Sequence, residues 1–92
     1  MNLDSKIVLV GTPVSVAKKV NKKDNTVYLL IQFLQRDSET SEVKLFDVKV
    51  EQAYLHNFSE IDEGKQVQIE ILIKTFQNQM FIRGIKLLKI AK

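Results

Sequence analysis

The chain has 92 residues, enough for one domain with a single modest core, so we expect residues 1–92 to form one domain. It contains no cysteine, which excludes disulfides and thiolate metal sites and fits a reducing cytoplasm, the location we expect. The first apolar run, residues 7–10, is much shorter than the apolar segment of a signal peptide. No stretch approaches the roughly 20 apolar residues of a membrane span, so we expect no membrane partner.

The formal net charge of +3 identifies no partner, but the charges are unevenly distributed along the chain. Residues 6–23 contain five lysines and no acid, and residues 74–92 contain five basic residues and no acid. Residues 37–63 contain eight acids and two lysines. If the two basic segments are neighbours in space, the fold has a basic side that attracts polyanions and an acidic side that does not.

The first strand is expected from residue 6 to about residue 20, with an interruption at Gly11-Thr12-Pro13. A glycine and a proline inside an extended run indicate a bend or a bulge. A first strand that bends to serve two sheets is what a small closed barrel requires.

A long β-hairpin is predicted for residues 14–36, with its turn at residues 21–25 and its second strand from about residue 26. One face of that strand carries Val27, Leu29, Ile31 and Phe33. The other face carries Tyr28, Leu30, Gln32 and Leu34. This second face is too apolar to meet only water, so we expect something to cover or contact it.

Residues 37–42 form a polar connector to a third strand at about residues 43–50. Its pairing with the strand before it brings Lys49 and Leu45 beside the face that carries Tyr28. Residues 51–61 break the alternation, and the spacing of their apolar residues predicts a short helical cap. Tyr54 and Phe58 in this cap are expected in the core.

A turn at residues 62–65 leads to a fourth strand at about residues 67–74, the cleanest alternation in the chain. The hairpin tip at residues 75–79 leads to a fifth strand at about residues 80–90, where Gly84 indicates a bulge. Five strands with a helical cap between the third and fourth predict an all-β, five-stranded OB-like barrel. An SH3-like barrel is the alternative.

Little in the sequence suits catalysis. His56 is the only histidine, and a nucleophile-base pair would need a serine such as Ser59 beside it. The three glycines are isolated, which excludes a glycine-rich phosphate loop. The acids near residue 62 lack the spacing of a calcium loop. We therefore predict no enzyme activity, no catalytic or metal site and no cofactor.

Binding of single-stranded nucleic acid needs cations that follow the phosphates and flat side chains on which bases stack. The first hairpin supplies the cations Lys18, Lys19, Lys22 and Lys23. Four further cations extend the set: Lys49, Lys74, Arg83 and Lys86. Tyr28 is the first stacking candidate, and Phe76 at the polar tip is the second. In the alternative interpretation the lysines are a solvated surface, Tyr28 and Phe76 pack on the protein, and Arg83 pairs with Glu70.

The closing segment Met80-Phe81-Ile82-Arg83-Gly84-Ile85-Lys86-Leu87-Leu88-Lys89-Ile90-Ala91-Lys92 resembles the end of the filamentous-phage single-stranded-DNA-binding (helix-destabilising) proteins. Thr26-Val27-Tyr28-Leu29-Leu30 falls where that family carries a base-contacting tyrosine and, two positions on, an apolar residue. The resemblance covers roughly residues 28–92 as a pattern of strands and loops. It implies an OB-like barrel, a homodimer and cooperative, largely sequence-independent coating of single strands during replication of a phage or mobile element.

The resemblance also implies roles for particular residues. Tyr28 would stack on a base with Leu30 beside it, and the lysines of the first hairpin would correspond to a basic binding loop. The family favours arginine in that loop, whereas lysine keeps the attraction to phosphate and loses the planar stacking of a guanidinium. The tip at residues 75–79 is rich in Gln and Asn, where the family has a glycine-containing loop with an aromatic tip. This difference leaves Phe76 and the dimer geometry open.

Two further functions are compatible with these residues. Single-stranded RNA satisfies the same contacts, because nothing in the sequence identifies a reader of the 2′-hydroxyl. A protein-protein adaptor would dock its partner on Tyr28, Leu30 and Leu34 and use the lysines only for solubility. Reversing the charge of Lys22 and Lys23 separates these functions, since an adaptor tolerates the change and a nucleic-acid binder weakens.

Overall fold

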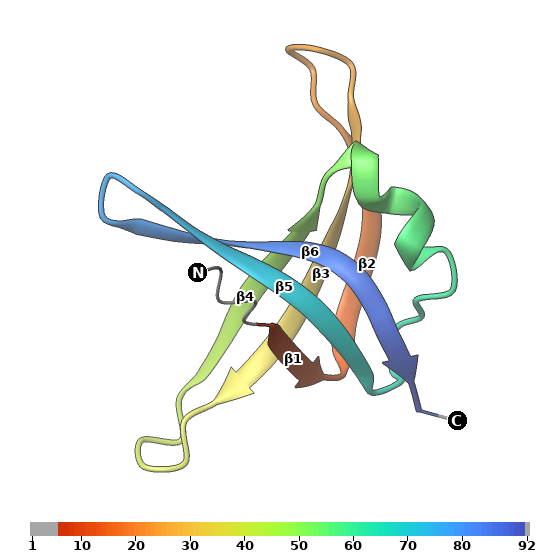
Figure 1. The fold of residues 1–92 in the computed structure, drawn as a ribbon. Helices are drawn as coiled ribbons and strands as arrows, with labels where there is room; N and C mark the ends of the chain where they lie inside the picture. The colour runs from red at the N-terminus through yellow and green to blue at the C-terminus, as the bar shows by residue number, and fades with distance from the viewer. Residues whose placement is uncertain (1–5, 92) are drawn as a thin grey trace, which may run out of the picture.

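The computed structural model describes residues 6–91 (Figure 1). These residues form one mostly β architecture with a single short 3-10 helix. The elements in chain order are β1 (Ile7–Gly11), β2 (Pro13–Val20), β3 (Val27–Arg36), β4 (Val43–Val50), η1 (Gln52–Phe58), β5 (Val67–Phe76) and β6 (Gln79–Ile90). The expected helical cap is confirmed, because η1 lies between β4 and β5. This seven-residue helix is too short to cross a membrane.

The prediction of a closed five-stranded barrel is wrong in two respects. The expected first strand is divided at Thr12 into β1 and β2, so the described residues form six strands in the order β1-β5-β6-β4-β3-β2. Pro13 lacks an N–H group, and the β2–β3 ladder shifts register between Pro13 and Ser15. β1 then pairs with β5 while β2 pairs with β3, which makes these two strands the edges of a sheet that hydrogen bonds do not close.

A long hairpin of β5 and β6 crosses the sheet formed by β2, β3 and β4, and its tip projects beyond it (Figure 1). β6 joins β4 through the single parallel pair Lys49 and Arg83. At the tip, Gln77 and Asn78 have φ angles of 49° and 63°, which a tight two-residue hairpin turn requires. We call the projecting part, residues 73–82, the arm.

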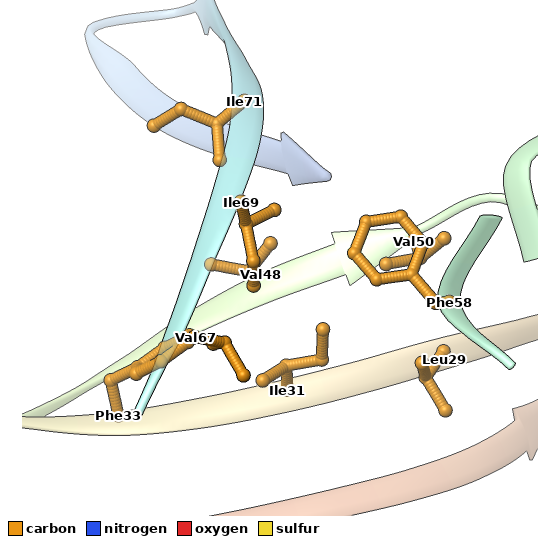
Figure 2. Close-up of a cluster of buried hydrophobic side chains, with 9 residues drawn as sticks. All are labelled: Leu29, Ile31, Phe33, Val48, Val50, Phe58, Val67, Ile69 and Ile71. Atoms are coloured by element: carbon orange, nitrogen blue, oxygen red, sulfur yellow. The ribbon is translucent and has the colours of Figure 1, made fainter. Parts of the chain in front are cut away.

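The core lies between β3 and β4 on one side and β5 with η1 on the other (Figure 2). Its nine buried side chains are Leu29, Ile31, Phe33, Val48, Val50, Phe58, Val67, Ile69 and Ile71. The alternation predicted for β3 is confirmed, because Leu29, Ile31 and Phe33 all face inward. Phe58 also lies in the core as expected, whereas Tyr54 does not, with 40% of its surface exposed.

Gly84 allows β6 to lie directly on the core. A Cβ atom at this position would come within 3.0 Å of both Phe58 and Val50. The predicted bulge is confirmed beside it, because Glu70 pairs with Lys86 while the next residue, Ile71, pairs with Gly84. One residue of β6 is therefore extra at this point, and the strand bends over the sheet.

Candidate nucleic-acid interface

One row of ladder partners runs across the side of the sheet that faces away from the core. Lys19 on β2 pairs with Tyr28 on β3. Two residues further along β3, Leu30 pairs with Lys49 on β4, and Lys49 pairs with Arg83 on β6. Directly paired residues project from the same side of a sheet, so these five side chains share one face.

The same face continues along the arm. Phe81, two residues before Arg83, pairs with Lys74 on β5, and Phe76 pairs with Gln79 next to the turn. Phe76 is the most exposed large apolar side chain of the described residues, at 66%. We call the combined surface the outer face: Lys19, Tyr28, Leu30, Lys49, Lys74, Phe76, Phe81 and Arg83.

Two cations of the outer face lie over aromatic rings. The Lys49 ammonium nitrogen is 4.6 Å from the centre of the Tyr28 ring, and the Arg83 guanidinium carbon is 5.4 Å from that of Phe81. Each pair is attractive because the ring face carries partial negative charge. Each also places a positive charge, which can bind a phosphate, beside a flat ring, on which a base can stack.

Acidic residues also reach this face. The Arg83 Nε donates a hydrogen bond of 3.3 Å to Glu51 Oε1, so the partner of Arg83 is Glu51 and not the Glu70 considered from the sequence. Asp47 accepts a hydrogen bond of 3.1 Å from the Gln32 side-chain amide. The expected division into one basic and one acidic side is therefore incomplete. β4 lies between the first hairpin and β6, so Lys49 on β4 lies between the lysines of the hairpin and Arg83 on β6.

A groove opens between β4 and β6 where the two strands diverge beyond the Lys49–Arg83 pair. Its volume is about 500 Å³. Leu30, Lys49, Phe81 and Arg83 of the outer face line it, together with Phe46, Asp47, Met80 and Ile82. The groove therefore has charged and aromatic walls and runs from the sheet toward the arm.

Lys22 and Lys23 lie exposed on the β2–β3 turn, beyond the Lys19–Tyr28 pair. Hydrogen bonds order this turn: Asn21 N–H donates to the Thr26 carbonyl at 2.8 Å, and Asn25 N–H donates to the Asn21 carbonyl at 2.7 Å. The Thr26 hydroxyl donates to Asp24 Oδ1 at 2.7 Å, and this bond, followed by the one from Thr26 N–H, lowers the pKa of Asp24. The lysines are thus carried by a defined turn.

The structure separates some of the residues that the sequence grouped together. Lys18 pairs with buried Leu29, so it projects from the side of β2 opposite to Lys19 and is not part of the outer face. Lys86 lies on the outer side of β6, but its ladder partner there is the acid Glu70. Of the remaining predicted cations, Lys22 and Lys23 lie on the β2–β3 turn. The others share the outer face with Tyr28, Leu30 and Phe76: Lys19, Lys49, Lys74 and Arg83.

Phe81 belongs to the outer face, but the sequence reasoning assigned it no role. The signal was present, because side chains alternate along a strand, so Phe81 must project from the same side as Arg83, two residues further on. The contact of Phe81 with Arg83 makes it the second aromatic residue of the face to carry a cation, after Tyr28.

No protein-family model matches this sequence, and no curated protein is significantly similar to it. The fold is similar to that of three solved structures, each named as a single-stranded DNA binding protein. The mitochondrial single-stranded DNA binding protein Rim1 from S. cerevisiae is 16% identical, with a TM-score of 0.66 and coverage of 98% of each chain. A second Rim1 structure is 19% identical, with a TM-score of 0.56 and coverage of 98% of this chain and 100% of Rim1.

The third structure is a small single-stranded DNA binding protein from Mycoplasma pneumoniae. It is 13% identical to this chain, with a TM-score of 0.55, and the alignment covers 95% of this chain and 94% of that one. At these identities the likeness concerns the fold alone. Neither named protein is of the filamentous-phage type, so that part of the resemblance remains a prediction.

Proposed function

We propose that this protein binds single-stranded DNA through the outer face and catalyses no reaction. The observation that carries the proposal is the pairing of cations with aromatic rings, Lys49 with Tyr28 and Arg83 with Phe81, on one face built from five strands. Lysine and arginine neutralise phosphates, and the rings accept unstacked bases of any sequence. Binding with little sequence specificity follows.

The proposed path of the strand begins at Lys22 and Lys23, crosses Tyr28 and Lys49, and reaches Arg83 and the arm. Two strand spacings separate β3 from β6, and four residues separate Arg83 from the arm tip, so the part of the path from Tyr28 to the tip is roughly 25 Å long. We therefore expect a site size at the low end of the roughly 4–16 nucleotides that one OB fold covers.

The names of Rim1 and of the Mycoplasma pneumoniae protein support binding of single-stranded DNA and the absence of catalysis, because each is a single-stranded DNA binding protein. The resemblance to the filamentous-phage proteins supports the finer parts of the proposal: a homodimer that coats strands during replication or transfer of a phage or mobile element. The absence of cysteine fits the proposed cytoplasmic location. Single-stranded RNA is a competing ligand, since the outer face has no identified reader of a 2′-hydroxyl.

The test is fluorescence anisotropy of a labelled 30-nucleotide oligothymidine, with the matching duplex and an oligouridine as controls, at several salt concentrations. We expect the single-stranded DNA to bind and the duplex not to bind. The logarithm of the affinity should fall by about 0.7 per phosphate contact for each unit of log salt. Equal binding of duplex, or no binding of the single strand at low salt, contradicts the proposal, and tighter binding of oligouridine reassigns it to RNA.

A protein-protein adaptor is the second candidate, and one observation favours it. Leu34 and Leu45 are direct ladder partners on the same side of the sheet as Leu30, and they are 53% and 59% exposed. Such a pair is typical of a contact with another protein. In this case Leu34→Glu and Leu45→Glu would abolish capture of the partner, while reversal of Lys22 and Lys23 would not.

A further inference from the structure

A second cavity lies away from the outer face, between β2 and η1. Its volume is about 490 Å³. Val16, Leu29, Leu55 and Phe58 form apolar walls, and Lys18 and His56 are the basic residues that line it. Leu29 and Phe58 are buried while Lys18 and His56 are exposed, so the cavity has an apolar interior and a basic opening. We call it the side pocket.

The side pocket arises because the segment between β4 and β5 is held to the rest of the chain by hydrogen bonds near its two ends. At one end Val27 N–H donates to Gln52 Oε1 at 2.9 Å, and the Asn57 side chain donates to the Ile85 carbonyl at 3.0 Å. At the other end Gly64 N–H donates to the Pro13 carbonyl at 3.0 Å. Between these contacts the segment passes over β2, and the side pocket is the space left between them.

The edge of β2 adds a hydrogen-bond donor to this space. Val16 N–H points to the free edge of the sheet, where it donates to Glu63 Oε1 at 3.0 Å. Backbone groups alternate between the two sides of a strand, so the N–H of Lys18 points to the same edge. The Lys18 N–H therefore lies at the free edge of β2, and the Lys18 side chain lines the side pocket.

We propose that the side pocket binds a small apolar anion, such as an aromatic or branched aliphatic carboxylate. Its volume lies within the roughly 300–1,000 Å³ of small-molecule sites. Lys18 and His56 complement a negative group, and no acid of residues 6–91 lines the pocket. At the free edge of β2 the Val16 N–H is already bonded to Glu63, and the strand ends at Val20, so the remaining edge is too short for an added peptide strand. This inference does not depend on the proposed function.

The test uses the full chain and the probe 8-anilinonaphthalene-1-sulfonate, an aromatic group with one sulfonate. We expect saturable binding of one probe per protomer, with increased fluorescence. Lys18→Glu should weaken probe binding roughly fivefold to tenfold, because it reverses the charge at the opening. Lys19→Glu is the matched control, since Lys19 is the next residue on the same strand but faces the opposite side, and it should change probe affinity less than about twofold.

The two lysines also separate this inference from the proposed function. Lys19→Glu should weaken oligothymidine binding, and Lys18→Glu should leave it within about twofold. Ser59→Trp, which places a large side chain at the pocket, should block the probe without lowering the thermal unfolding midpoint. Equal effects of the two lysine variants on the probe, several probes per protomer, or displacement of the probe by oligothymidine would overturn the inference.

Discussion

Lys49 on β4 holds its ammonium nitrogen 4.6 Å from the centre of the Tyr28 ring on β3. The two residues are 21 positions apart in the sequence, and the β3–β4 ladder brings them together by pairing Lys49 with Leu30, two residues from Tyr28. The contact orients the ring on the outer face and places a cation beside it. A base that stacks on Tyr28 therefore brings its phosphates near Lys49.

Tyr28→Ala should weaken binding of oligothymidine without unfolding the protein, because Tyr28 is outside the core. Stacking on an aromatic residue contributes about 1–3 kcal/mol per base, so we expect Kd to rise roughly 5-fold to 150-fold. Anisotropy titration measures this change. The control is Tyr54→Ala, which removes an exposed tyrosine from η1; equal losses in the two variants would show that Tyr28 is not a stacking residue.

Reversal of both Lys22 and Lys23 to Glu should lower the affinity for oligothymidine by at least about tenfold at low salt, because two phosphate contacts are lost. The slope of log affinity against log salt should decrease in magnitude by about 1.4, since each contact contributes about 0.7. Lys44→Glu is the control, because Lys44 pairs with Gln35 and projects from the opposite side of β4 to Leu45. An unchanged slope in the double variant would remove the turn from the binding site.

Gly84→Ala should destabilise the fold, because its Cβ would lie 3.0 Å from Phe58 and from Val50 in a packed core. Overpacking of this kind costs about 1–3 kcal/mol, which urea denaturation can measure. At Gly64 a Cβ meets nothing within 4 Å, and φ is +81°, a conformation that asparagine tolerates. Gly64→Asn should therefore cost less than about 1 kcal/mol. An equal loss at the two positions would contradict the role of close packing at Gly84.

Thr26→Val should raise the pKa of the Asp24 carboxyl toward its ordinary value of 3.8, because the threonine hydroxyl is the main group that lowers it. A carboxyl whose pKa is lowered by folding stabilises the turn above the unfolded pKa, and this effect is lost as the pH falls through the folded pKa. The turn that carries Lys22 and Lys23 should therefore loosen only below about pH 4.

An NMR titration that follows the side-chain carboxyl carbon of Asp24 measures this change in pKa. Thr40→Val is the matched control, because the Thr40 hydroxyl accepts the Glu42 N–H in the other hairpin loop and does not contact Asp24. The Asp24 titration should be the same in this variant and in the unmodified protein. A pKa of Asp24 that does not move in Thr26→Val would contradict the assigned cause.

Local patterns in the sequence determined the strands, the hairpin turns and the cap. Alternation of apolar residues has a period that depends only on neighbours along the chain, so the inward positions Leu29, Ile31 and Phe33 could be predicted. The bulge at Gly84 was also predictable, since a glycine there interrupts the alternation in β6. The opposite orientations of Lys18 and Lys19 follow from the same alternation.

Tertiary structure decided which of these residues meet. The pairing of Arg83 with Glu51, the position of Lys49 over Tyr28 and the division of the first strand into two sheet edges all depend on contacts between distant segments. The side pocket likewise exists only because both ends of the segment between β4 and β5 are fastened by contacts with other parts of the chain. Periodicity specifies the side of a strand to which a residue projects. The partner across the ladder depends on strand order, which the packing of the whole core selects.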